Sequence, residues 1–202
     1  MLTMEESQES ISSPSTVSSN HQSPQSLTYP KIVLQENINM VLILSKILLN
    51  ILSQNKNLPN YFGKIKENKD FHFTIMKQPS ISLFDYLKRI LTFIKLDFST
   101  LIIAMIYIDR ICKEKVFLNE FNIHRILVIA IYIAYTYNED QTFDNDYLSL
   151  VSGINKEEMV TLEEDFLELI EFKLFVKEQL YEQYKERVLN DYFNDNNYYL
   201  GY

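Results

Sequence analysis

The sequence predicts an all-α fold, and three features of its 202 residues support this prediction. Glycine and proline are scarce, with three and five residues, so few tight turns can be built. Apolar residues recur at the three- and four-residue spacing of a helix face in several long segments. No segment of convincing length alternates apolar and polar residues as a half-buried strand does. The chain is therefore expected to pack helix against helix around one core.

The first two segments differ sharply in composition. Residues 1–30 are rich in serine, glutamine and asparagine and poor in large apolar groups, so we expect a disordered tail. From 33 to 54 apolar residues crowd at helical spacing, and we expect an amphipathic helix that covers the domain or touches a partner. The polar stretch after it, which holds Pro59 and Gly63, is expected to be a connector.

Three helices are predicted next. One begins near Ser82 and carries an apolar stripe, and the following one is capped by Asp97 or Ser99. The third is apolar on every side between Ile126 and Tyr135. A helix of that kind is surrounded by others in a globular protein, so we expect it at the centre of the fold.

The last third of the chain predicts further helices, which brings the expected number to about seven. A short one lies in the segment "NDYLSLVSG", and a longer one starts with the capping box of Asn155 and Glu158 and runs to about Leu174. A C-terminal helix is expected over 176–189, followed by a polar tail over 190–202 without clear periodicity.

Several classes of protein do not fit the sequence. A formal net charge of -8 argues against nucleic acid and anionic membranes as partners. The apolar stretches are shorter than the roughly 20 residues of a spanning helix. The three histidines lie far apart without metal-ligand partners, and no phosphate-binding loop or nucleophile motif occurs. We expect no cofactor, no metal, no enzymatic activity and a cytoplasmic and/or nuclear location.

Five segments together resemble one family. They occur in the order and spacing of P-type (also called U-type) cyclins, the phosphate-response cyclin family, and read "PSISLFDYLKRI", "LIIAMIYIDRIC", "NIHRILVIAIYIAY", "DNDYLSLVSGI" and "EEMVTLEEDFLELIEFKLFV". The resemblance is good from about 81 to 176 and weaker back to Val33. It implies a single five-helix cyclin box over about 81–176, within a cyclin domain over 31–188 that has helices flanking the box.

The resemblance also implies a function. A P-type cyclin would bind and activate a cyclin-dependent protein kinase, in cell-cycle or nutrient and developmental signalling, and would do no chemistry itself. The alternative is a degenerate cyclin-fold scaffold that activates no kinase. The positions that the family places against the kinase are Ile133, Thr136, Tyr137, Glu139, Glu163, Leu167, Phe172 and Leu174.

The resemblance implies that two of these positions depart from the usual pairing. Most cyclins carry a lysine where this chain has Thr136, and its ammonium group bridges the box glutamate, here Glu163, to the kinase backbone. A hydroxyl is uncharged and its stem is short, so we expect Glu163 to lack that cation. Apolar neighbours three and four residues on either side predict that Glu163 lies in an apolar patch, and the alternative is an acid at the rim with its head in water.

The Tyr-Ile-Asp-Arg motif at 107–110 places charge in an apolar helix. Asp109 is expected to form a structural ion pair with Arg89 of the preceding helix, because a buried carboxylate needs a cation. The competing interpretation pairs Arg89 with Asp85, four residues earlier. Residues 79–83 lack the Met-Arg-Ala-Ile-Leu docking motif, so no docking of Arg-x-Leu peptides is expected.

Overall fold

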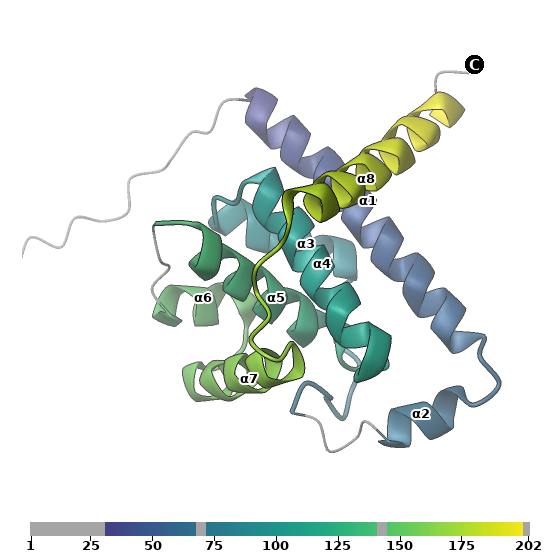
Figure 1. Cartoon of the computed structure of the whole chain (residues 1–202), viewed down its shortest axis with the longest axis vertical. Helices are drawn as coiled ribbons and strands as arrows, with labels where there is room; N and C mark the ends of the chain where they lie inside the picture. Colours follow the sequence, from purple (N-terminus) through teal and green to yellow (C-terminus); the bar gives the residue numbers. More distant parts are fainter. Residues whose placement is uncertain (1–30, 68–71, 141–144, 200–202) are drawn as a thin grey trace, which may run out of the picture.

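The computed structural model describes residues 31–67, 72–140 and 145–199, and in these ranges it contains helices and no strand (Figure 1). The all-α prediction is confirmed, with eight helices in the described part of the chain rather than about seven. The predicted disordered tail lies outside the described residues. The helices are α1 (Lys31–Lys56), α2 (Tyr61–Glu67), α3 (Leu83–Phe93), α4 (Phe98–Glu114), α5 (Ile123–Asn138), α6 (Asn145–Ser152), α7 (Lys156–Leu169) and α8 (Glu178–Tyr199).

The centre of the fold is α5, as its sequence predicts. Every side chain from Ile126 to Tyr135 is buried. Helix α4 packs along one side of α5 and α7 along another, and α3 lies beside α6 (Figure 1). The side chains of α5 therefore form the centre of the core.

Helix α1 covers α3. Its Val41, Leu44 and Leu48 are buried, and it packs against α3. Helix α8 also contacts α1 and crosses it near the top of Figure 1. The described part of the apolar stripe predicted over 33–54 therefore packs on the domain, from Met40 onward.

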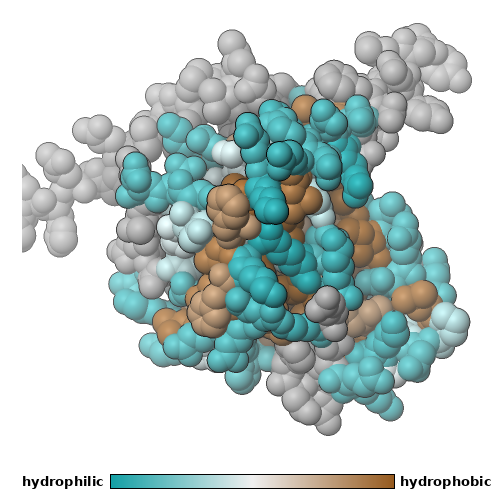
Figure 2. Space-filling model, in the orientation of Figure 1, coloured by the Kyte–Doolittle hydropathy of each residue, from teal (hydrophilic) through white to brown (hydrophobic). Residues whose placement is uncertain are grey.

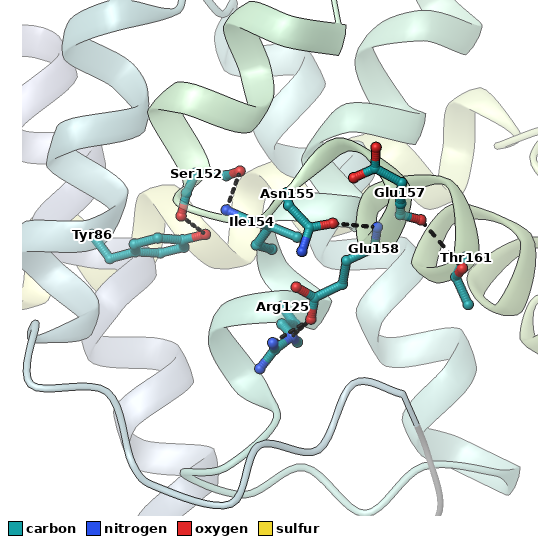
Figure 3. A network of polar contacts seen from close by, with 8 residues as sticks. All are labelled: Tyr86, Arg125, Ser152, Ile154, Asn155, Glu157, Glu158 and Thr161. Carbon is teal, nitrogen blue, oxygen red and sulfur yellow. Dashed lines mark hydrogen bonds and ion pairs between the residues drawn. The ribbon is translucent and has the colours of Figure 1, made fainter.

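A polar network fixes the start of α7 (Figure 3). The Asn155 side chain accepts a hydrogen bond from the Glu158 backbone N–H (2.8 Å), which is the cap that the sequence predicts. Arg125 of α5 donates from Nε to the Glu158 carboxylate (2.8 Å). The Tyr86 hydroxyl of α3 donates to the Ser152 carbonyl (3.2 Å). Helix α3 is thus tied to the end of α6, and α5 to the first turn of α7.

Gly153 allows this turn to close. Its φ of 74° lies in the left-handed region that favours glycine, and its N–H donates to the Ser149 carbonyl as α6 ends. Arg89 donates to the adjacent Ser152 carbonyl (3.0 Å), with its Nη2 3.5 Å from the position of an added Cβ. Any other residue here would be strained.

Three predicted elements are wrong in their bounds. Helix α7 ends at Leu169 rather than near Leu174. The expected connector contains α2, whose Tyr61 is buried and donates a hydrogen bond to the Glu120 carboxylate. Helix α8 begins at Glu178 and continues to Tyr199, so much of the predicted polar tail is helical.

Replacing Asn155 by alanine is expected to lower the free energy of unfolding by about 1 kcal/mol, because the Glu158 N–H loses its side-chain acceptor. Urea unfolding followed by circular dichroism measures the change. Asn155→Asp keeps an acceptor at the same place and serves as the control. Equal losses in both variants would contradict the capping role.

Candidate functional site

The Tyr-Ile-Asp-Arg motif fastens the segment after α7 onto α4. The Tyr107 hydroxyl donates to the Leu174 carbonyl (2.8 Å), and the Arg110 guanidinium donates to the carbonyls of Lys173 and Phe175. Burial raises the pKa of Tyr107 to about 12, so its hydroxyl keeps its proton at neutral pH. Three consecutive carbonyl groups of the segment are therefore held by α4.

Asp109 of the same motif binds α8 instead of α3. Its carboxylate accepts a hydrogen bond from the Tyr184 hydroxyl and pairs with Lys113 one helical turn later (2.8 Å). The side chain of Asp109 is 40% exposed, so the carboxylate has water as well as these partners. It connects α4 to α8 at the edge of the domain.

The predicted ion pair between Arg89 and Asp109 is therefore wrong, and so is the competing pair with Asp85. Arg89 donates to the α6–α7 turn and lies over the Tyr86 ring, 5.3 Å from its centroid. Asp85 accepts a hydrogen bond from the Ser82 hydroxyl (2.6 Å) at the helix start. The bonds of Asp85 and Arg89 thus lie away from Asp109, and the Nε of Arg89 is buried without a hydrogen-bond partner.

The turn after α7 has an unusual backbone. Glu171 and Phe172 have φ values of 55° and 54°, a left-handed conformation that costs a non-glycine residue about 1–2 kcal/mol. The Phe172 N–H donates to the Leu167 carbonyl (2.9 Å), and Lys115 donates to the Leu169 carbonyl (3.0 Å). These bonds satisfy the end of α7 and hold the turn in place.

The residues assigned to kinase binding differ in their exposure. Phe172 and Tyr137 are exposed, at 68% and 52%, whereas Ile133 is only 2% exposed and belongs to the core. The remaining five, Thr136, Glu139, Glu163, Leu167 and Leu174, are half-buried. Phe175, which the family resemblance did not single out, is 70% exposed. On the face shown in Figure 2, hydrophilic residues cover most of the surface and hydrophobic residues show mainly near its centre.

Glu163 is a partly desolvated carboxylate. Met159 and Phe166 on the same helix are buried, and Leu167 is half-buried. Burial raises the pKa of Glu163, and the charge of Glu164 adds to the effect. No cation of the described residues forms an ion pair with it. The carboxylate therefore lies in apolar surroundings without a cation.

Thr136 does not supply a donor to that carboxylate. Its hydroxyl lies 3.0 Å from the Tyr132 carbonyl and 3.3 Å from the Ile133 carbonyl, to which it donates within α5. A threonine in mid-helix commonly bonds to the preceding turn in this way. Glu139, at the end of α5, accepts a hydrogen bond from the Thr100 hydroxyl (3.4 Å).

The described residues contain neither a metal-binding cluster nor a membrane-spanning helix. Within 31–67, 72–140 and 145–199, no group of three or more histidine, cysteine or acidic residues is placed to hold a metal ion. None of the helices described there is long and apolar enough to cross a membrane. Burial raises the pKa of Cys112 to about 12, which keeps this thiol protonated and unreactive.

Comparison with known proteins identifies one family. The family described as Cyclin matches residues 3–174. Cyclin-U4-3 of Arabidopsis thaliana is 37% identical over 121 residues, which are 59% of this chain and 55% of that protein. Cyclin-U2-1 of the same plant is 31% identical over 147 residues, 72% of this chain and 65% of that protein. Cyclin-P4-1 of Oryza sativa subsp. japonica is 35% identical over 114 residues, 55% of this chain and 54% of that protein.

These relatives are similar to the chain over part of their length. The chain spans about half to two thirds of each of the relatives named above. The family match over residues 3–174 includes α3 to α7, with the partly desolvated carboxylate of Glu163 on α7, and continues into the segment after α7 as far as Leu174.

A double-mutant cycle tests the contact between α4 and α8. Asp109→Ala and Tyr184→Phe are expected to show a coupling energy of about 1 kcal/mol in urea unfolding, because the hydroxyl donates to a charged, half-exposed acceptor. The matched cycle of Asp109→Ala with Arg89→Ala is expected to show none. A coupling energy found only between Asp109 and Arg89 would contradict this contact and support the ion pair predicted from the sequence.

Proposed function

The chain belongs to the cyclin family, and on this premise we propose that it is a regulatory subunit that binds and activates a cyclin-dependent protein kinase. Cyclins are regulatory proteins rather than enzymes. This chain would bind beside the mobile regulatory helix of the kinase and shift the kinase population toward its active arrangement. The proposed setting is cell-cycle or nutrient and developmental signalling.

The observation that carries the proposal is the exposure of Phe172 on the hydrogen-bonded turn that follows α7. Its side chain is 68% exposed. The backbone on either side of it is held by hydrogen bonds from Tyr107 of α4 and from Lys115, which directly follows α4. An exposed aromatic side chain on a fixed backbone loses little conformational freedom on binding, and aromatic side chains often anchor interfaces. Tyr137 at the end of α5 is also exposed.

Thr136 favours the second candidate, a scaffold that activates no kinase. Without the lysine, Glu163 would be covered by a kinase as an unpaired carboxylate, at a cost of about 1–3 kcal/mol. A cation from the kinase or a bridging water could offset this cost. Adding the purified chain to a monomeric cyclin-dependent kinase separates the candidates, because only a regulatory subunit raises kinase activity.

Replacing Glu163 by alanine is expected to weaken kinase binding and to leave helicity unchanged. The carboxylate is half-buried in an apolar patch that the kinase would cover. Co-purification with the kinase and far-ultraviolet circular dichroism give the two readouts. Glu164→Ala, one residue further on the exposed side of α7, is the matched control. Unchanged co-purification of the Glu163 variant would remove this residue from the interface.

Replacing Thr136 by lysine is expected to tighten kinase binding several-fold, because an ammonium group would reach Glu163 and the kinase backbone. Adding Glu163→Gln to this variant should abolish the gain. Titration of each variant against the partner kinase measures the affinities.

Thr92→Lys is the matched control for that titration. Thr92 is exposed on α3 and its hydroxyl donates to the carbonyl four residues earlier, as that of Thr136 does. The control adds the same positive charge away from Glu163, so it shows how much of any change in kinase affinity comes from net charge alone. A Thr136→Lys variant that binds no better, or worse, would show that the interface is built around a neutral residue.

A further inference from the structure

A cationic cavity lies where the end of α4 meets the segment after α7. Its volume is about 410 Å³. Its polar lining residues are Arg110, Lys113, Lys115, Glu171 and Lys173, and its apolar ones are Leu169, Ile170 and Phe175. Four cationic side chains and one carboxylate therefore line it. This is an unusual concentration of positive charge in a chain whose formal net charge is -8.

The backbone after α7 separates this cavity from the proposed kinase surface. Glu171, Lys173 and Phe175 line the cavity, whereas Phe172 and Leu174, which lie between them in sequence, are not among its lining residues. Arg110 fixes the arrangement by donating to the carbonyls on either side of Leu174. A ligand in the cavity would thus touch the same segment from a second side.

The charges in the cavity are only partly balanced. Asp109 pairs with Lys113 (2.8 Å), and Glu171 is shared by Lys115 (2.7 Å) and Lys173 (2.5 Å). Hydrogen bonds from Lys115 and then Lys173 lower the pKa of Glu171 to about 2, so it is ionised at neutral pH. Two carboxylates against four cations leave two positive charges. A phosphate monoester carries about -1.5 to -2 charges at neutral pH.

We propose that this cavity binds a phosphate group, either free or carried on a serine or threonine side chain of another protein. The oxygens of a phosphate accept the charge-assisted hydrogen bonds that guanidinium and ammonium groups donate. The cavity volume falls within the range of about 300–1,000 Å³ that small-ligand sites occupy. Phe175 offers an apolar wall to whatever carries the phosphate. This role goes beyond kinase binding and does not depend on it.

Isothermal titration calorimetry on the full chain, without a kinase, tests the proposal. The probes are inorganic phosphate, a short phosphothreonine peptide and the same peptide without phosphate. We expect the phosphate-bearing probes to bind and the unphosphorylated peptide not to bind. Tighter binding of the phosphopeptide assigns the site to a side chain, and binding of inorganic phosphate without a gain from the peptide assigns it to a small ligand.

Variants connect the binding to this cavity. Lys113→Gln with Lys173→Gln should weaken binding about tenfold, because each lysine would donate a charge-assisted hydrogen bond to the phosphate. Glu171→Gln should tighten binding several-fold by removing a competing carboxylate. The matched control is Lys156→Gln with Lys185→Gln, two lysines that pair with carboxylates away from the cavity.

Three results would overturn the proposal. They are the absence of binding by both phosphate-bearing probes, equal binding of the unphosphorylated peptide, and an equal loss in the control pair. Thermal unfolding of every variant shows whether it is folded. The Glu171→Gln variant is a further control, because an unfolded protein could not bind phosphate more tightly. Loss of kinase binding by the chain would leave all of these results unchanged.

Discussion

Hydrogen bonds from Tyr107 and Arg110 to the backbone after α7 determine the shape of the surface proposed to bind the kinase. Helix α7 is followed by a turn with two non-glycine residues, Glu171 and Phe172, in the left-handed backbone conformation that such residues avoid. It persists because α4 donates to three carbonyl groups beyond the turn and Lys115 donates to one before it. The exposed position of Phe172, the cationic cavity and the direction in which the chain enters α8 all follow from this attachment.

The same motif explains why an otherwise apolar helix carries adjacent charges. Ile108 is buried in the core, where α4 packs on α5. Asp109 and Arg110 lie at the edge of α4, half-buried, and each contacts a different part of the C-terminal chain. Asp109 reaches α8 and Arg110 reaches the segment before it. Four residues thus connect the core to two elements that come more than 60 residues later in the sequence.

Local and periodic features could be predicted from the sequence. The enclosed α5 follows from an apolar stretch without a polar side, and the start of α7 follows from its capping box. The end of α7 could not be predicted, because Phe172 and Leu174 continue an apolar pattern and the helix is stopped by contacts with α4. The hydrogen-bond partner of Asp109 could not be predicted either. Tyr184 lies 75 residues further along the chain, and a neutral tyrosine is not an expected partner for a carboxylate in search of a cation. Helix α2 carries a glycine and two lysines in seven residues, which is a weak helical signal.

Amide hydrogen exchange in an Arg110→Lys variant tests the central claim most directly. Lysine keeps the charge but lacks the planar fork that reaches two carbonyl groups at once. If α4 holds the segment after α7, amides from 171 to 177 should exchange faster in the variant, while those of α5 keep their protection. Unchanged exchange over 171–177 would show that the segment keeps its course without Arg110 and would contradict the account.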